Sequence, residues 1–150
     1  MTVIAWDGKT LAADSRVTVH SAIVDDNMQK LYRLHKEIMY GGDKLLAVGW
    51  SGDAADVDRV LCYLYSEEFP SDMEVKHGIG ALVIGKKYAY ILEPGQSFLI
   101  RYRRNTKLAE GCGAPFAMSA MKLGLNAVQA VKHAIKLDSA CGGKIRSIEL

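Results

Sequence analysis

The sequence is poor in cysteine, and its few cysteines are far apart. They are Cys62, Cys112 and Cys141 in a chain of 150 residues. An odd number at such wide spacings matches neither a disulfide framework nor the short ligand spacings of a zinc motif. We therefore expect reduced thiols.

The sequence also lacks long apolar runs and a strong charge of either sign. No segment approaches the roughly 20 apolar residues that span a bilayer, and the first residues lack the regions of a signal peptide. The net charge is only +2, with 49% hydrophobic and 24% charged residues. We therefore expect a single domain over residues 1–150, located in the cytoplasm, with neither nucleic acid nor membrane as a partner.

The first 50 residues are predicted to be mainly extended. Asp7-Gly8 is a strong hairpin-turn dipeptide. Residues 17–29 have a mixed pattern, which predicts a loop or a partly extended segment. Strands are expected at residues 2–6, 9–16, 30–34 with 38–40, and 45–49.

The pattern then becomes helical and later extended again. Asp53 is a candidate N-cap, and the helix that follows ends by Pro70. Its apolar face has helical spacing and consists of Val57, Val60, Leu61 and Leu64. Residues 78–102 have the pattern of a β meander, followed by a short strand at 108–111.

Two more helices are expected near the end of the chain. Pro115 suits the first turn of one, and Gly124 suits its C-terminal cap. Asn126 caps the other, with Gln129 three residues later, and Gly142-Gly143 ends that region before a last strand. Because strands and helices occur in separate runs, the sequence predicts an α+β fold.

Thr2 is the first candidate for chemistry. Removal of Met1 would leave Thr2 with a free α-amine. That amine has a pKa near 8, so it could take the hydroxyl proton and activate a weak nucleophile. The alternative is that Met-Thr is simply a common way for a chain to begin.

Three further residues could complete such a site. Asp14 ends the second strand, Lys30 opens the next, and Gly49 ends an apolar strand. A lysine ammonium near the terminal amine would favour its neutral, basic form, and a glycine N–H can stabilise an oxyanion. The alternatives are an exposed ion pair on strand edges and an ordinary turn glycine.

The remaining reactive side chains form no recognisable catalytic arrangement in the sequence. Cys112 and Cys141 lie in glycine-rich turns, and we interpret both as unreactive thiols rather than parts of a Cys-His enzyme. The four histidines are scattered, and the basic stretch 101–107 is expected to decorate a hairpin.

Six segments, in this order, resemble the proteasome β subunit and, most closely, the bacterial HslV peptidase. The resemblance runs from residue 2 to about residue 143. The segments are Thr2-Val3-Ile4, Ala12-Ala13-Asp14-Ser15-Arg16, Gln29-Lys30-Leu31-Tyr32-Arg33-Leu34, residues 47–56, residues 111–117 and Asp138-Ser139-Ala140-Cys141-Gly142-Gly143.

The resemblance implies a four-layer αββα sandwich of the N-terminal-nucleophile hydrolase type and a threonine peptidase. Thr2 would be the nucleophile and its own amine the base. Lys30 and Asp14 would tune and hold the site, the Gly49 N–H would form the oxyanion hole, and Asp138 would support the neighbouring turn.

The resemblance also implies partners. These are an unfolded protein or peptide substrate, other copies of the chain in a ring, and an ATP-dependent unfoldase. No cofactor is required, but a structural sodium ion could bind to backbone carbonyls. In this sequence they would belong to Leu137, Ala140 and Gly143.

Two departures from the family pattern stand out. Cys112 and Cys141 occupy two turn positions where the family pattern has serine, and the resemblance places both among the site residues. Cysteine is a poorer hydrogen-bond donor than serine. The segment around residues 69–79 is too short for the second long helix of the family, so we expect a shortened domain.

Two alternative functions remain open from the sequence. If Met1 is retained, the base is blocked, and the chain would be a catalytically silent assembly subunit. An N-terminal-nucleophile amidohydrolase that acts on a small amide is the other alternative.

Overall fold

A computed structural model describes residues 2–53, 57, 78–96 and 99–150. Within these ranges the chain forms short strands followed by two helices and a last strand. The elements are β1 (Ile4–Trp6), β2 (Thr10–Ala13), β3 (Val17–Val19), β4 (Ala22–Asp25), β5 (Leu31–Tyr40), β6 (Asp43–Ser51), β7 (Gly80–Gly85), β8 (Tyr88–Leu92), β9 (Ile100–Arg103), β10 (Leu108–Glu110), α2 (Ala114–Lys122), α3 (Ala127–Leu137) and β11 (Arg146–Glu149).

The first sheet has the strand order β10-β1-β2-β11, and all of its pairings are antiparallel. The predicted β1–β2 hairpin is confirmed, with Gly8 at a φ of 102° in its turn. Asp7 accepts hydrogen bonds from the N–H groups of Thr10 (2.8 Å) and Ala127 (2.8 Å). Burial raises the pKa of Asp7, but these backbone donors outweigh it and hold the pKa below its usual range. One turn residue thus fixes the hairpin against the start of α3.

The second sheet is antiparallel with the order β5-β6-β7-β8-β9. Its pairing shifts within β5, between Arg33 and Ile38, and within β6, between Leu45 and Ala47. Along β6, the second shift inserts one extra residue and reverses the alternation of side chains. Leu45 and Ala47 therefore belong to different core clusters although they are two residues apart.

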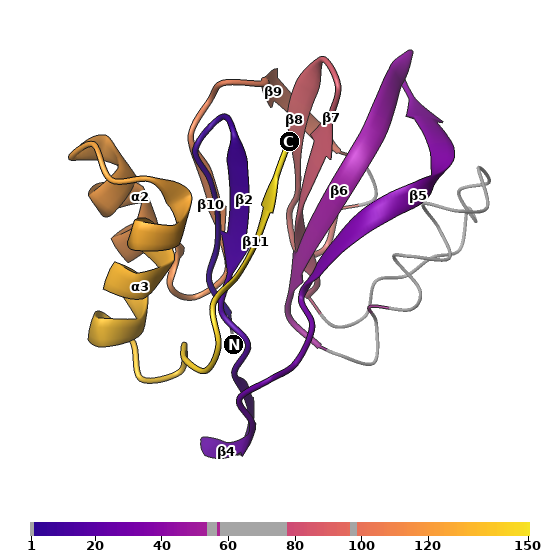
Figure 1. Cartoon of the computed structure of the whole chain (residues 1–150). Coiled ribbons are helices and arrows are strands. Elements are labelled where there is room, and N and C mark those ends of the chain that lie inside the picture. The colour runs from indigo at the N-terminus through magenta and orange to yellow at the C-terminus, as the bar shows by residue number, and fades with distance from the viewer. Residues whose placement is uncertain (1, 54–56, 58–77, 97–98) are drawn as a thin grey trace.

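The layers follow from the faces of the two sheets (Figure 1). Helices α2 and α3 cover one face of the first sheet, where Val3, Ala5 and Ala12 pack against buried alanines of both helices. The other face packs on the second sheet, with Trp6 and Leu82 in the shared cluster. The described residues therefore form a helix–sheet–sheet arrangement, consistent with the predicted α+β class.

The two C-terminal helices are confirmed, including the predicted cap. The Asn126 side chain accepts from the Gln129 N–H (2.9 Å), and the Gln129 side chain accepts from the Asn126 N–H (3.0 Å). No helix in the described ranges is long and apolar enough to cross a membrane.

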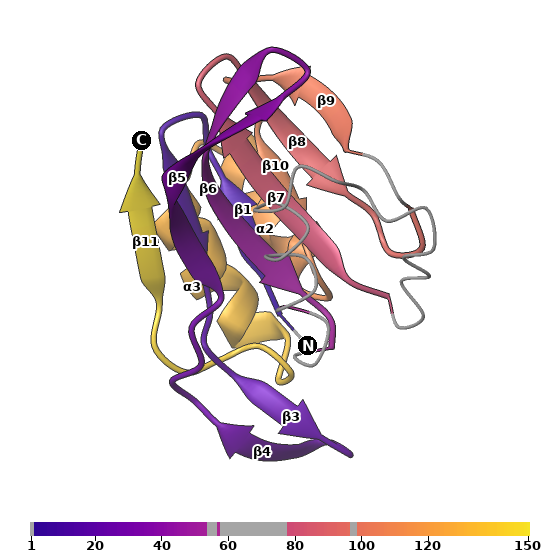
Figure 2. The ribbon, with the colours of Figure 1, turned by 90° about the vertical axis from the view of Figure 1, so that its right-hand side faces the viewer.

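Residues 17–29, predicted as a loop or a partly extended segment, are partly extended. They contain the hairpin of β3 and β4, which extends beyond both sheets (Figure 2). Its turn has positive φ angles at His20 (48°) and Ser21 (67°). A hairpin turn with two positive φ values normally uses Asn or Gly, so the sequence carried no turn signal there.

Other predictions differ from the structure only in the bounds of a strand, or concern residues that the structure does not describe. β5 is one strand where two pieces were expected, and β6 is longer than 45–49 at both ends. Of the helix predicted after Asp53 the structure describes only Val57, which is helical, because residues 54–56 and 58–77 lie outside the described ranges. The shortening predicted around 69–79 falls mainly on the same undescribed residues.

Candidate active site

A cleft of about 440 Å³ opens beside Thr2, just before β1. Thr2 lines this cleft together with Lys30 and is itself only 2% exposed. The other lining residues come from the β3–β4 hairpin and from the end of β6; they are Arg16, Val17, Thr18, Val19, Trp50, Gly52 and Asp53. The cleft therefore brings together two of the residues predicted for catalysis.

Asp14 and Lys30 form a buried ion pair. Lys30 Nζ lies 2.8 Å from Asp14 Oδ1, and the two side chains are 1% and 0% exposed. Lys30 Nζ also donates to the carbonyl oxygen of Arg16 at 2.7 Å. The alternative considered from the sequence, an exposed ion pair on strand edges, is therefore wrong. A buried pair is retained only where hydrogen bonds hold both partners, as they do here.

Backbone pairing explains why Asp14 reaches the start of the chain. Beyond β1 and β2, the Asp14 N–H donates to the Val3 carbonyl at 3.2 Å, and the Val3 N–H donates to Asp14 Oδ1 at 3.1 Å. The other oxygen, Oδ2, accepts from the Gly142 N–H at 2.9 Å. Asp14 thus links Lys30, the residue after Thr2, and the turn after α3.

Gly49 lies in a tightly packed part of β6. It pairs with Leu31 of β5, and a Cβ atom there would lie 2.8 Å from Leu31 Cδ2 and 2.9 Å from Ile4 Cγ2. Glycine is therefore required for the close approach of the two sheets. The interpretation of Gly49 as an ordinary turn residue is wrong, because it lies within a strand. Its role in an oxyanion hole stays a prediction.

Trp50 follows Gly49 and contributes a donor that the sequence reasoning overlooked. Its backbone N–H bonds the Lys30 carbonyl at 3.1 Å, whereas its buried indole N–H has no acceptor in the part of the chain that the structure describes. A buried donor without an acceptor is costly, and a ligand that supplies an acceptor would remove that cost.

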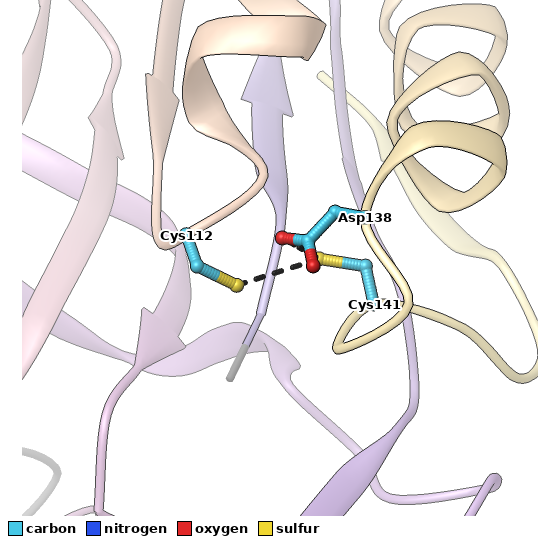
Figure 3. A group of neighbouring side chains, drawn as sticks. All are labelled: Cys112, Asp138 and Cys141. Carbon is cyan, nitrogen blue, oxygen red and sulfur yellow. Dashed lines mark hydrogen bonds between the residues drawn. The ribbon is translucent and has the colours of Figure 1, made fainter. Parts of the chain in front are cut away.

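Cys112, Cys141 and Asp138 meet where the turn after β10 approaches the turn after α3 (Figure 3). The two Sγ atoms are 3.6 Å apart, and Cys141 Sγ lies 3.5 Å from Asp138 Oδ2. Cys112 Sγ contacts the carbonyl oxygen of Thr2 at 3.5 Å. The structure therefore brings these three predicted site residues together with the candidate nucleophile.

The two thiols differ in acidity. The Cys141 thiol, as donor, lowers the pKa of Cys112, while the same hydrogen bond and burial raise the pKa of Cys141. Burial raises the pKa of Asp138, but donors that include the Cys112 thiol and the Ala140 N–H outweigh it and lower the pKa overall. The prediction of an unreactive thiol suits Cys141, whereas Cys112 is exposed and more acidic than an ordinary thiol.

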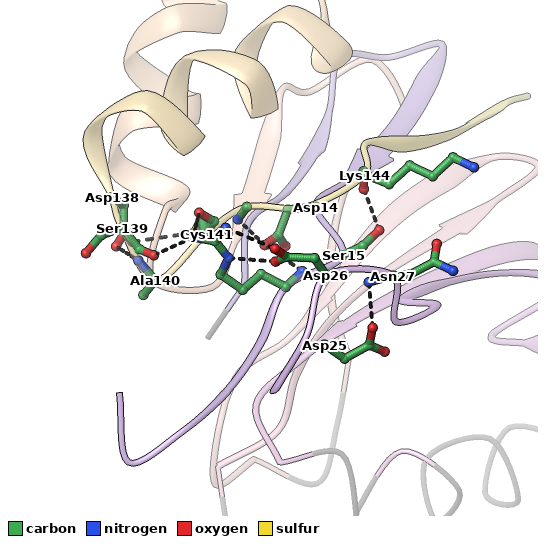
Figure 4. A network of polar contacts seen from close by, with 12 residues as sticks. Asp14, Ser15, Asp25, Asp26, Asn27, Asp138, Ser139, Ala140, Cys141 and Lys144 are labelled. Atoms are coloured by element: carbon green, nitrogen blue, oxygen red, sulfur yellow. Dashed lines mark hydrogen bonds and ion pairs between the residues drawn. The ribbon is translucent and has the colours of Figure 1, made fainter. Parts of the chain in front are cut away.

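Arg16 organises the turn after α3 and was not singled out from the sequence. Figure 4 shows this turn, with Ser139 and Cys141, on the same side of the molecule as Asp26. Its guanidinium donates to Asp26 at 2.8 Å and to the carbonyl oxygens of Ser139 (3.0 Å) and Cys141 (3.5 Å). The only sequence signal was its place two residues after Asp14. Arg16 thus ties the β3–β4 hairpin to the turn that carries Cys141.

The backbone carbonyls of Leu137, Ala140 and Gly143 belong to the same turn region. Carbonyl oxygens are suitable ligands for a hard cation. Arg16 already supplies a positive charge to two neighbouring carbonyls, and the sodium site stays a prediction.

Glu110 is another residue near Thr2 that the sequence reasoning overlooked. It ends β10, and its Oε1 lies 3.4 Å from the hydroxyl of buried Ser51. Burial raises the pKa of Glu110 more than the Gly111 N–H and Ser51 hydroxyl lower it. No local pattern distinguished Glu110 from a solvent-exposed strand residue.

Comparisons with known proteins agree with this geometry at the level of the fold. No protein-family model matches the sequence, and no curated protein sequence does either. Among solved structures, the eukaryotic HslV from Trypanosoma brucei matches with a TM-score of 0.67 and 17% identity over 99% of both chains.

The BPH protein of Thiobacillus denitrificans gives a similar match. Its TM-score is 0.67 with 17% identity, over 99% of this chain and 96% of that chain. The same protein in complex with epoxomicin matches with a TM-score of 0.64 and 16% identity, over 99% and 97%. At this level of identity the likeness establishes the architecture, and we conclude that the chain has the HslV and proteasome β-type fold.

Proposed function

We propose that this protein is a threonine-type peptidase in which Thr2, freed by removal of Met1, is the nucleophile. The observation that carries the proposal is the buried Lys30–Asp14 ion pair, whose lysine lines the same cleft as Thr2. Burying an ion pair costs free energy, so its place beside a potential nucleophile favours a role in chemistry.

The first step of the proposed reaction is acyl transfer to Thr2. The α-amine takes the hydroxyl proton of Thr2, and Oγ1 attacks the carbonyl carbon of the substrate amide. The oxyanion accepts a hydrogen bond from a backbone N–H near the end of β6, for which the resemblance suggests Gly49. The C–N bond breaks as the ammonium returns the proton to the leaving amine. Water then hydrolyses the ester by the same route.

Lys30 and Asp14 act on the base in this scheme. The Lys30 ammonium disfavours a second positive charge on the nearby α-amine, so more of the amine is neutral at a given pH. Asp14 fixes that ammonium and, through the Val3 N–H, the backbone next to Thr2.

An unfolded protein or peptide suits the cleft as substrate. The β3–β4 hairpin forms one wall, and Trp50, near the end of β6, forms part of another. One structural neighbour, the BPH protein, is described in complex with epoxomicin, which makes that compound a useful probe of this cleft.

The assembly that we propose is a homo-oligomeric ring served by an ATP-dependent unfoldase. Its support is the exposed apolar surface of the β3–β4 hairpin, where Val19, Ile23 and Val24 are 52%, 55% and 64% exposed. Patches of this kind mark contact surfaces. Light scattering coupled to gel filtration tests the oligomer, and a single-subunit mass would contradict it.

We also propose the full four-layer αββα arrangement. The face of the second sheet that points away from the first carries a buried apolar cluster, including Val48, Val83 and Tyr90. Apolar side chains on an outer sheet face require a covering layer. In the family arrangement that layer is helical.

The test compares two forms of the same chain. One form begins at Thr2, produced by cleavage of an N-terminal fusion, and the other retains Met1. Intact mass and N-terminal sequencing establish each form. Only the Thr2 form should hydrolyse fluorogenic peptides and a small unfolded protein.

Two variants make the test specific. Thr2→Ala should remove all activity, and Thr2→Ser should retain part of it because serine keeps the hydroxyl. Hydrolysis by Thr2→Ala would contradict the proposed nucleophile. A Thr2 form that cleaves only small amides would favour the amidohydrolase alternative, and a fully inactive one the silent subunit.

A further inference from the structure

Three potential metal ligands from distant parts of the chain meet beside Thr2. Cys112 lies in the turn after β10, and Asp138 and Cys141 lie in the turn after α3. One sulfur or carboxylate oxygen from each lies within 4.8 Å of the others (Figure 3). This cluster is the only one of its kind among the residues that the structure describes.

The spacing of these ligand atoms matches a tetrahedral metal site. With Zn–S bonds of about 2.3 Å and Zn–O bonds of about 2.0 Å, tetrahedral geometry requires sulfur–sulfur and sulfur–oxygen separations of about 3.8 and 3.5 Å. The Cys112–Cys141 Sγ separation is 3.6 Å, and that between Cys141 Sγ and Asp138 Oδ2 is 3.5 Å. A small shift of side chains is enough to close the site around an ion.

The surrounding backbone holds the ligands in place without a metal. Asp138 Oδ1 accepts the Ala140 N–H at 2.9 Å, and the Asp138 carbonyl accepts the Cys141 N–H at 3.0 Å. Opposite them, a Cβ on Gly113 would lie 2.7 Å from Val3 Cβ and 2.9 Å from Cys141 Sγ. Glycine at this position is what allows the two turns to approach so closely.

We propose that Cys112, Cys141 and Asp138 bind a soft divalent cation, with Zn²⁺ as the best match. Two thiolates favour zinc over magnesium or calcium, and one carboxylate completes a three-ligand set of the kind found in sites with an open fourth position. Binding releases the two thiol protons to solvent as the thiolates form the metal bonds.

The site has direct access to solvent and to Thr2. Cys112 is exposed, so an ion can enter from that side, whereas Cys141 is buried. The carbonyl oxygen of Thr2 lies 3.5 Å from Cys112 Sγ, at the spacing expected for a fourth ligand. This side-chain site is separate in its ligands from the predicted sodium site, which would use backbone carbonyls.

Occupancy would have a consequence that rests on the proposed function. A bound ion would join the two turns beside Thr2 and occupy the Cys112 thiol that contacts the Thr2 carbonyl. Zn²⁺ should therefore inhibit the peptidase when Thr2 is the first residue. Metal binding itself does not depend on activity and is measured separately.

The experiment is a Co²⁺ titration of the reduced chain of residues 1–150, followed by displacement with Zn²⁺. Wild-type protein should bind one Co²⁺ with a thiolate-to-metal charge-transfer band and intense visible bands of a tetrahedral site. Zn²⁺ should remove both. At about 100 times its dissociation constant, Zn²⁺ should raise the melting temperature by about 5–10 °C.

Variants distinguish the site from adventitious thiol binding. Cys112→Ser, at an exposed position, should weaken binding at least about 100-fold, and Asp138→Asn about 10–100-fold. Cys62→Ser is the matched control and should leave the spectrum unchanged. Absence of the charge-transfer band in wild-type protein, or its persistence in Cys112→Ser, would overturn the site. A peptidase assay that fails while the cobalt spectrum appears would count against the proposed function alone.

Discussion

Among the residues that the structure describes, two aspartates are completely buried, and their surroundings differ. Asp43 opens β6 far from the cleft, and Asp14 follows β2 beside it; both are 0% exposed. Asp43 is held by neutral donors, namely the N–H groups of Lys87 (2.8 Å) and Tyr88 (3.0 Å) and the hydroxyl of Tyr90 (3.1 Å). Burial, reinforced by Asp43, raises the pKa of Tyr90, which keeps that hydroxyl protonated.

Asp14 is instead paired with a buried cation. Lys30 Nζ lies 2.8 Å from it, and it also accepts from the backbone N–H groups of Val3, Arg16 and Gly142. Neutral donors are enough to anchor a buried carboxylate, as Asp43 demonstrates. The additional burial of a lysine at Asp14 is therefore not needed for anchoring, and it points to a chemical role for the Lys30 ammonium.

The largest effect is expected from breaking the ion pair. Lys30→Met leaves Asp14 buried and uncompensated, so the free energy of unfolding should fall by about 3–5 kcal/mol. Urea denaturation followed by circular dichroism measures this. Hydrolysis should be lost as well.

The double variant Asp14→Asn with Lys30→Met is the control. It removes both charges and should recover most of the lost stability without recovering activity. A loss of less than about 1 kcal/mol in Lys30→Met, as for a surface pair, would contradict the comparison.

The second effect concerns the neutral shell of Asp43. Asp43→Asn replaces one accepting oxygen with a donor, which leaves at least one N–H or O–H group unpaired. We expect a cost of about 1–3 kcal/mol in unfolding free energy and an unchanged kcat/KM. Tyr90→Phe removes one donor only and should cost about 0.5–1.5 kcal/mol. A loss of activity in folded Asp43→Asn would remove the distinction between the two aspartates.

A smaller effect tests the packing that brings β6 to the cleft. Gly49→Ala places a methyl group against Leu31 and Ile4 and should cost about 1–2 kcal/mol. Leu31→Val in the same chain should relieve part of that cost. If the Gly49 N–H serves the oxyanion, kcat/KM should stay low in the relieved double variant; recovery of both properties would limit Gly49 to packing.

The smallest effect comes from Glu110, a carboxylate with only weak donors. The pKa of Glu110 in the folded protein is raised above its ordinary value of 4.5, so protonation of Glu110 favours the folded state. This contribution to stability is fully present below pH 4.5 and is lost as the pH rises through the folded pKa. Glu110→Gln should match wild type near pH 4 and become more stable than wild type towards pH 7, by less than about 1 kcal/mol. Thermal melts of both proteins across this pH range measure the difference in stability. A stability advantage of Glu110→Gln that shrinks as the pH rises would contradict the raised pKa of Glu110.

Local sequence signals predicted most of the described fold. Asp7-Gly8 gave the first hairpin, and the Asn126–Gln129 capping box gave the start of α3. The β3–β4 hairpin was missed because His20 and Ser21 do not favour the positive φ angles that its turn requires. The shifts within β5 and β6 were missed because a bulge depends on the facing strand.

The candidate site divides in a similar way. Their charges and their places at strand ends identified Asp14 and Lys30, the resemblance agreed, and the structure shows that they pair and are buried. Arg16 and Glu110 were overlooked because the partners that give them a role, such as the Ser139 carbonyl and Ser51, are far away in the chain.

The sequence by itself determined the α+β order of elements, the turns and caps, and the residue types available to a nucleophile at Thr2. These depend on interactions between near neighbours, which periodicity and turn chemistry encode. Only the tertiary structure decided that Cys112 and Cys141, 29 residues apart, lie 3.6 Å from each other beside Thr2. Such contacts arise because helices and sheets pack into layers, and layer packing brings together turns that no local pattern relates.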